Sequence, residues 1–240
     1  MLALNLRILA SVLPLLWPGP SPRQPELGDF AVKGIRDLEA TVTVAKADLA
    51  QLEKINKDFG ILYRLRDVTI RYKEPDKFRV DSRLGVFIVN GSMRFLKVPQ
   101  LGLKKRDDMG AELGKRHSLL DVGLITPTRL EQMRARYVRS ETVRGLVMPV
   151  FEVSFSQSET AKYLLWLDPA KKLVARRRWL DNGGDVRATF DYLEPVEAAP
   201  GIWIPTRIEV RNDSAALAGA TVYRDLKVNR DPEDSLFSAD

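Results

Sequence analysis

The feature that most constrains the fold is a regular alternation of apolar and polar residues, clearest in the stretch 163–211. Apolar residues occupy every second position over 186–192, and almost every second position over 202–210. A period of two with one apolar and one charged face is typical of antiparallel strands that are covered on one side only. Turn-forming residues at 182–184 and 200–201 favour chain reversals between these strands. The sequence therefore predicts an antiparallel sheet, and functional residues are expected on its covered side.

The same pattern recurs over most of the chain and predicts a mainly β protein (α+β) of about eleven strands. The chain has 240 residues, of which 45% are hydrophobic, so it is long enough to bury a sizeable core in one domain over 37–240. Carboxylates on the polar faces are expected to form cross-strand pairs with arginine. Besides the four strands of 163–211, the pattern predicts strands at 38–44, 62–72, 77–84, 86–90, 92–98, 137–143, 149–156 and 220–228.

Two or three helices are expected around the sheet. Between Lys46 and Phe59, the residues Leu49, Leu52 and Ile55 recur at spacings of three, which predicts an amphipathic helix that Gly60 ends. This helix either packs on the sheet or closes one mouth of a cavity. Within 99–137 the β pattern lapses, and this connection is interpreted either as a lid or as a cover for one open end. Thr126 and Pro127 begin a short helix in it, which carries Leu130 and Met133.

The N-terminal residues 1–22 are interpreted as an export signal. Arg7 supplies the basic n-region, and Ile8–Trp17 is an apolar run of h-region length that is too short to span a bilayer. The alternative is a buried N-terminal helix, but several prolines between 14 and 25 disfavour it. Residues 23–36 are expected to form a spacer with a short helix. The predicted location is therefore the periplasm of a Gram-negative type of envelope.

Composition excludes several kinds of site. The chain contains no cysteine, so no disulfide and no thiolate nucleophile or metal ligand is available. A single histidine, His117, excludes metal sites that need two imidazoles, and it is interpreted as a surface or loop residue. No phosphate-binding, dinucleotide, hydrolase or zinc motif occurs. We therefore expect no metal, no cofactor, no catalytic residue and no enzymatic activity.

The charge of the chain does not identify a partner. A net charge of +6 permits contact with nucleic acid, lipid head groups or acidic proteins. Arg176, Arg177 and Arg178 alternate between the two faces of a strand, so they form no single patch, and nucleic-acid binding is not expected. At most peripheral contact with a membrane is expected.

Two arginines break the alternation in an informative way. Arg177 shares a face with Leu173, Ala175 and Trp179, and Arg224 shares one with apolar residues of 222–228. An arginine that faces a closed core is costly unless it is paired, whereas one that lines a wet cavity can hold a carboxylate, phosphate or ester oxygen. The alternative is that these strands lie at a rim, where the arginine reaches water.

Three short stretches resemble outer-membrane lipoprotein-sorting proteins of the LolA-like superfamily: 72–80 (YKEPDKFRV), 201–209 (GIWIPTRIE) and 223–229 (YRDLKVN). The likeness covers most of 37–237. It implies a curved antiparallel sheet that forms an incomplete barrel capped by helices. It also implies a periplasmic carrier of lipoprotein acyl chains, with an inner-membrane transporter and an outer-membrane acceptor as partners. The functional arginine of the carriers lies on an early strand and is not uniquely matched among Arg64, Arg66, Arg71, Arg79 and Arg83.

The leading hypothesis is a non-catalytic carrier that binds lipid or lipoprotein acyl chains in an apolar half-barrel cavity. The residues expected to line the cavity are Phe151, Val153, Phe155, Trp179, Phe190 and Ile204, with Arg177 and Arg224 as polar contacts. The residues expected beneath its lids are Leu49, Leu52, Ile55, Leu130 and Met133. The alternative is a structural or sensory β-domain with a solid core that binds a protein partner through its basic outer face. A third hypothesis, an envelope hydrolase, requires His117 or a carboxylate pair inside the cavity.

Overall fold

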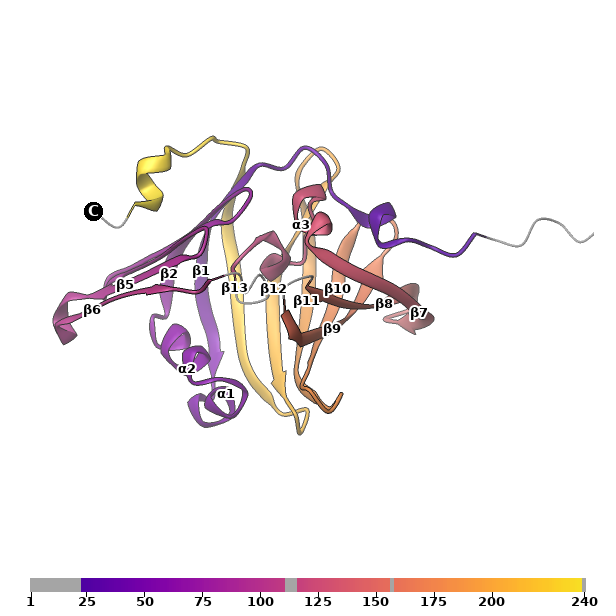
Figure 1. The fold of residues 1–240 in the computed structure, drawn as a ribbon, viewed down its shortest axis with the longest axis horizontal. Coiled ribbons are helices and arrows are strands. Elements are labelled where there is room, and N and C mark those ends of the chain that lie inside the picture. Colours follow the sequence, from indigo (N-terminus) through magenta and orange to yellow (C-terminus); the bar gives the residue numbers. More distant parts are fainter. Residues whose placement is uncertain (1–22, 111–115, 156–157, 239–240) are drawn as a thin grey trace, which may run out of the picture.

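The computed structural model describes residues 23–110, 116–155 and 158–238, and the predicted export signal at 1–22 lies outside this range. One sheet of thirteen antiparallel strands dominates the described chain (Figure 1). The spatial order is β6-β5-β4-β3-β2-β1-β13-β12-β11-β10-β9-β8-β7, and the two edge strands are not joined into a barrel. The predicted fold class, a curved antiparallel sheet capped by short helices, is confirmed. Among the described residues, no helix combines the length and the apolarity needed to cross a membrane.

The first half of the sheet extends from β1 to the edge strand β6. A 3-10 helix, η1 (Leu27–Phe30), precedes it, and two α-helices interrupt it after β1. Its elements are β1 (Asp37–Ala47), α1 (Leu49–Ile55), α2 (Lys57–Arg64), β2 (Asp67–Lys73), β3 (Lys77–Ser82), β4 (Val86–Asn90), β5 (Met93–Val98), η2 (Pro99–Leu101) and β6 (Leu103–Asp108).

The second half extends from the other edge strand, β7, back to the centre, where β13 pairs with β1. Its elements are η4 (Leu119–Val122), α3 (Pro127–Glu131), β7 (Met133–Val143), β8 (Leu146–Phe155), β9 (Ser158–Asp168), β10 (Leu173–Leu180), β11 (Val186–Ala199), β12 (Ile202–Asn212), β13 (Leu217–Val228) and η5 (Asp234–Phe237).

Several expectations about local structure were wrong. Met133 begins β7 and does not lie in the short helix, which ends at Glu131. Gly60 does not end a single helix, because Asn56 separates α1 from α2 and Gly60 lies inside α2. As a result, the predicted strand at 62–72 begins only at Asp67. The sequence analysis also missed β6, because this edge strand is exposed along almost its whole length and its sequence LKKRDD has no apolar face.

The segment of residues 116–132, here called the crossing segment, joins the two edges of the sheet. β6 and β7 lie at opposite edges, and residues 116–132, which lie between them in the sequence, pack on the concave side (Figure 1). Its buried residues join the main core, and Leu124 is fully buried there. The amide of Val174 donates to the carbonyl of Gly123 (2.9 Å), at the point where β10 has an irregular register. The interpretation of this connection as a cover is therefore correct for residues 116–132.

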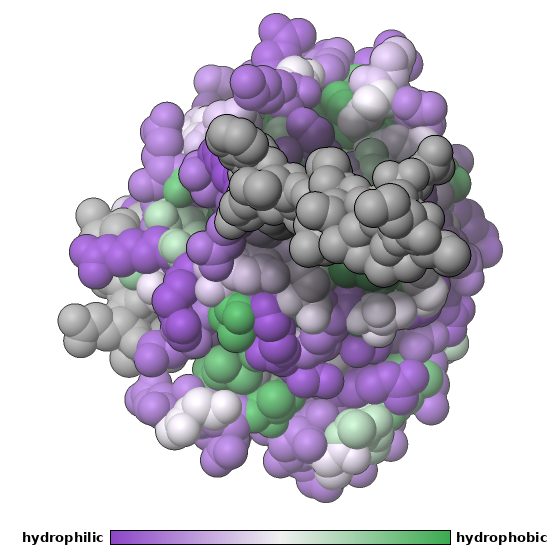
Figure 2. All heavy atoms as spheres, turned by 90° about the vertical axis from the view of Figure 1, so that its right-hand side faces the viewer, coloured by the Kyte–Doolittle hydropathy of each residue, from purple (hydrophilic) through white to green (hydrophobic). Residues whose placement is uncertain are grey.

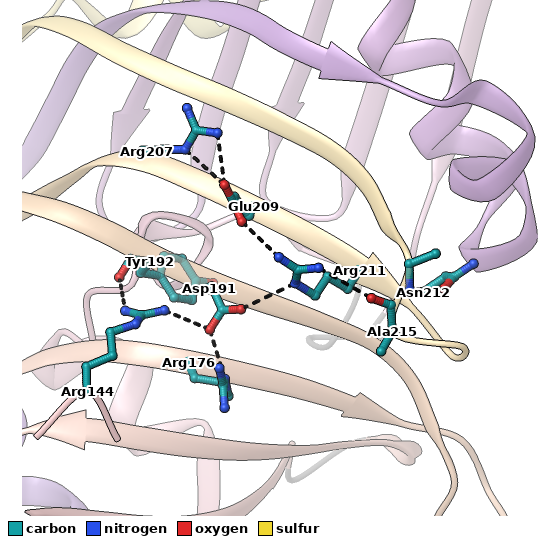
Figure 3. A network of polar contacts seen from close by, with 10 residues as sticks. Arg144, Arg176, Asp191, Tyr192, Arg207, Glu209, Arg211, Asn212 and Ala215 are labelled. Carbon is teal, nitrogen blue, oxygen red and sulfur yellow. Dashed lines mark hydrogen bonds and ion pairs between the residues drawn. The ribbon is translucent and has the colours of Figure 1, made fainter. Parts of the chain in front are cut away.

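The outer face of the sheet is held by ion pairs. Asp191 on β11 forms ion pairs with Arg176 of β10 (2.8 Å) and with Arg144 of the β7–β8 turn (3.0 Å). Glu209 of β12 forms ion pairs with Arg207 and Arg211 (Figure 3). Arg176 and Asp191 face each other in the register of β10 and β11, so the expected cross-strand pairing is confirmed. On the side of the molecule that is on the right of Figure 1, hydrophilic residues cover most of the surface (Figure 2).

Shortening one side chain of the crossing segment tests whether this segment is a structural part of the core. The Leu124→Ala substitution is expected to lower the free energy of unfolding by about 2–5 kcal/mol, because it deletes a fully buried side chain. The Leu103→Ala substitution, at a side chain that is 40% exposed on β6, is expected to cost about 0.5 kcal/mol or less. Urea denaturation measures both values. Equal stability of the two variants would show that the segment is a loosely held lid.

Candidate ligand-binding cavity

A cavity of about 1150 Å³ lies between the concave face of the sheet, helix α2 and the crossing segment. Apolar side chains form extensive parts of its walls because the inward positions of the alternating strands face it, and charged residues such as Arg66, Arg94, Asp107 and Arg116 also line it. From the first half of the sheet and from α2, it is lined by Val42, Val44, Phe59, Leu62, Val68, Ile70, Phe78 and Val80. From the second half, it is lined by Phe155, Tyr163, Trp179, Phe190, Ile208 and Tyr223.

A cluster of polar side chains interrupts this apolar wall. Asp121, in η4 of the crossing segment, accepts from the Ser118 amide (3.1 Å) and from the Tyr72 hydroxyl (3.4 Å) at Oδ2. The ring of His117 lies with Nδ1 3.0 Å from the same oxygen. Arg177 of β10 approaches the other oxygen, Oδ1, at 3.6 Å. Three distant parts of the sequence therefore meet at one carboxylate.

The cluster strongly favours the ionised form of Asp121. Burial alone raises the pKa of this carboxyl, but the hydrogen bond with His117 and the nearby guanidinium of Arg177 outweigh it, so the pKa falls to about 2. Burial raises the pKa of the Tyr72 hydroxyl well above its ordinary value. At neutral pH the cluster thus presents a carboxylate, a guanidinium and a neutral phenol to the cavity.

His117 lies in a loop, as one interpretation of the sequence held, but it lines the cavity. Its ring stacks on Phe78 with centroids 4.5 Å apart and meets Phe87 edge-on at 5.7 Å. These contacts fix the plane of the imidazole, and Asp121 fixes its rotation. Among the residues that the structure describes, no group of three or more histidine, aspartate or glutamate side chains is arranged to hold a metal ion.

The structure brings only some of the predicted site residues to the cavity. Those in its lining are Phe155, Arg177, Trp179 and Phe190. Those buried in the core away from the lining are Leu52, Ile55, Phe151, Val153 and Ile204. Those half-buried against the core are Leu49, Leu130 and Met133. Arg224 is exposed on β13, whereas its neighbour Tyr223 lines the cavity, because successive residues of a strand point to opposite faces.

Sequence reasoning missed the residues that complete the cavity. Leu62 lies in a helix that was predicted as strand, and Asp121 lies in a segment without periodicity. One local signal was present. Ser118 and Asp121 have the spacing of a capping box, in which each side chain accepts a hydrogen bond from the backbone amide of the other residue, and η4 has this cap.

Comparisons with known proteins identify the fold. No protein-family model and no curated protein sequence matches the chain. Solved structures do match. A protein domain from Vibrio parahaemolyticus, named as outer-membrane lipoprotein-sorting, has a TM-score of 0.60 at 16% identity, over 88% of this chain and 92% of that one. A DUF1329 family protein from Desulfovibrio piger has a TM-score of 0.61 at 11% identity, over 89% and 93%.

A LolA superfamily protein from Nitrosomonas europaea is similar in the same way, with a TM-score of 0.57 at 15% identity over 88% of this chain and 94% of that one. The three likenesses extend over nearly the whole length of both partners. The chain therefore has a LolA-like fold, as the three short sequence stretches predicted.

The low pKa of Asp121 predicts a specific dependence of stability on pH. The folded-state pKa of about 2 lies below the unfolded value near 4, so the stabilisation is complete above about pH 5 and is lost as the pH falls towards 2. It amounts to about 2 kcal/mol. The difference in unfolding free energy between the native protein and Asp121→Asn, measured by denaturation, is expected to shrink between pH 5 and pH 2. An unchanged difference would contradict the role assigned to the carboxylate.

Proposed function

We propose that this protein is a non-enzymatic carrier of the cell envelope that binds acyl chains of lipids or lipoproteins in the concave cavity. The observation that supports this most directly is a cavity of about 1150 Å³ whose walls have extensive apolar parts, inside an incomplete barrel. Pockets for drug-sized ligands are roughly 300–1,000 Å³. The cavity is thus large enough for a ligand with one or more long chains.

The energetics of acyl-chain burial support the same proposal. Transfer of an acyl chain from water into an apolar cavity returns about 0.8 kcal/mol per methylene. A chain of a dozen carbons therefore contributes on the order of 10 kcal/mol before the costs of association are subtracted. Side chains such as Val42, Val68 and Ile208 supply the required surface without any polar recognition. Affinity then requires no catalytic groups.

The likeness to a solved protein named as outer-membrane lipoprotein-sorting agrees with the proposal. So does the export signal proposed for residues 1–22, which would deliver the chain to the periplasm. A carrier in that compartment needs a donor and a recipient for its cargo. We therefore propose an inner-membrane transporter and an outer-membrane acceptor as partners.

The two rival hypotheses, a protein-binding β-domain and a hydrolase, predict different features of the protein interior. A β-domain that only binds a protein partner was expected to have a filled core, which the cavity of about 1150 Å³ argues against. A hydrolase requires His117 or a carboxylate pair in the cavity, and His117 does lie there, beside Asp121. Within the described residues, however, the hydrogen bond of its ring is to Asp121, and Ser118 uses its hydroxyl to cap η4. The carrier is the better supported of the three.

Two neighbouring residues of α2 provide a matched test. Leu62 lines the cavity, whereas Ile61 is 51% exposed and does not line it. The Leu62→Glu substitution is expected to weaken the binding of a neutral fluorescent long-chain ester by about tenfold or more, because the site would have to bury or displace a carboxylate. The Ile61→Glu substitution adds the same charge to the same helix and is expected to leave the affinity unchanged. Fluorescence titration of the purified, delipidated protein measures both.

Two further readouts complete this test. Native mass spectrometry of the protein purified from an envelope fraction is expected to show a bound acyl ligand. Analysis of the ester after binding is expected to recover it intact. Failure of the native protein to bind the ester would contradict the carrier function, and hydrolysis of the ester would support the hydrolase instead.

A further inference from the structure

Arg177 is a largely, but not fully, buried cation whose capacity for hydrogen bonds is little used. Its side chain lines the cavity and is only 12% exposed. Its Nε atom is buried and has no hydrogen-bond partner in the part of the chain that the structure describes. A guanidinium has five N–H donors, and a buried polar group without a partner costs free energy. The position therefore favours a further acceptor next to Arg177.

Asp121 does not fully neutralise this cation. Its contacts with His117, Ser118 and Tyr72 all converge on Oδ2, at 3.0, 3.1 and 3.4 Å. The contact of Arg177 is with Oδ1 at 3.6 Å, which is longer than a hydrogen bond. By contrast, Arg176, the preceding residue on the outer face, lies 2.8 Å from Asp191. The carboxylate in the cavity is thus directed mainly at the crossing segment, and the guanidinium is left with free donors.

Aromatic rings shield one side of Arg177 from bulk water, and a second arginine, Arg129, lines the same cavity. The guanidinium lies over the rings of Phe190 at 4.5 Å and Tyr163 at 5.6 Å, which hold it in place. Arg129, from α3, also lines the cavity. Arg177, Arg129 and Asp121 are thus all part of the lining, and further charged residues line the same cavity, among them Arg116, Arg187, Asp107 and Asp108. Glu74 lies near Arg129, hydrogen-bonded to Thr126, but does not line the cavity.

We propose that the cavity selects acyl ligands with an anionic head group, a carboxylate or a phosphate, and that Arg177 binds the anionic oxygen. The inference rests on the proposed carrier function and adds the chemical class of the ligand. The apolar walls bind the chain, and the Arg177 guanidinium, oriented by Phe190, binds the head. Such a pair forms charge-assisted hydrogen bonds in a partly desolvated site, where they are stronger than in water.

The test compares ligands of one chain length that differ only in the head. Hexadecanoate, hexadecyl phosphate and hexadecanol compete with the neutral fluorescent ester for the delipidated protein, at sub-micellar concentration and at about pH 8, where the carboxylic acid is ionised. At least one of the two anions is expected to bind about tenfold or more tightly than the alcohol. The ratio between hexadecanoate and hexadecyl phosphate distinguishes the two kinds of head.

Variants test whether Arg177 causes the preference for anionic ligands. The Arg177→Gln substitution is expected to reduce the affinity for the anion to that for hexadecanol and to leave hexadecanol binding unchanged, while Arg177→Lys retains part of the preference. The matched control is Arg178→Gln, because Arg178 is the next residue on β10 but lies over the ring of Trp166 and does not line the cavity. Asp121→Asn removes the competing carboxylate and is expected to strengthen anion binding.

The outcomes separate the inference from the function on which it rests. Equal affinity for the anions and the alcohol in the native protein would overturn the inference and leave the carrier function standing. An anion preference that persists in Arg177→Gln would overturn the role of Arg177. Binding of none of the three ligands, nor of the ester, would overturn the carrier function and the inference together. The comparison in the native protein remains decisive even if Arg177→Gln does not fold.

Discussion

The crossing of the chain from β6 to β7 is the constraint on which the rest of the structure depends. The first and last strands pair at the centre of the sheet, so the strands that follow β1 and those that precede β13 extend in opposite directions. The two edges are consequently joined by a single connection. In a curved sheet this connection takes the concave side. Its apolar residues, among them Leu119, Val122 and Leu124, then cover the core strands without any additional layer of long helices.

The crossing segment also determines where the cavity lies. It packs on the second half of the sheet, where Val174 and Tyr192 hydrogen-bond to its carbonyl groups. On the inward face of β1 to β3 the segment contacts only the end near Tyr72 and Phe78, and α2 closes the other end. The cavity lies between them, beside residues such as Val42 and Ile70. The polar cluster lies where these two regions meet. Asp121 comes from the crossing segment, and Tyr72 and Arg177 come from the two halves of the sheet.

These relations explain which features the sequence could predict. Alternation is local, so it identified the strands and the inward positions of Phe155, Trp179 and Phe190. The alternation did not reveal β6, because this strand has no buried face. It also gave a wrong result for the end of α2, where residues from 62 onward were predicted as strand. Alternation failed in β13, where the register with β1 is irregular near Asp225. Arg224 is exposed, whereas Leu226 and Val228, which were expected on its face, pack against the core. Ile204 and Phe151 were correctly predicted to be buried but do not line the cavity. A buried residue borders a cavity only if no other segment covers it, and the sequence pattern does not reveal such a cover.

The sheet places arginine in two physically different environments. On the outer face, Asp191 and Glu209 are each shared by two or more guanidinium groups that remain in contact with water, so these largely buried carboxylates have several direct partners (Figure 3). Inside, the Arg177 side chain lines the cavity, is only 12% exposed and has one carboxylate at 3.6 Å, so its burial is costly unless a further acceptor joins it. Asp121 does not supply this acceptor in full, because its hydrogen bonds with His117 and Ser118 lie within the crossing segment and converge, with that of Tyr72, on the other carboxylate oxygen. The anionic head group proposed above would supply the acceptor that the fold leaves out.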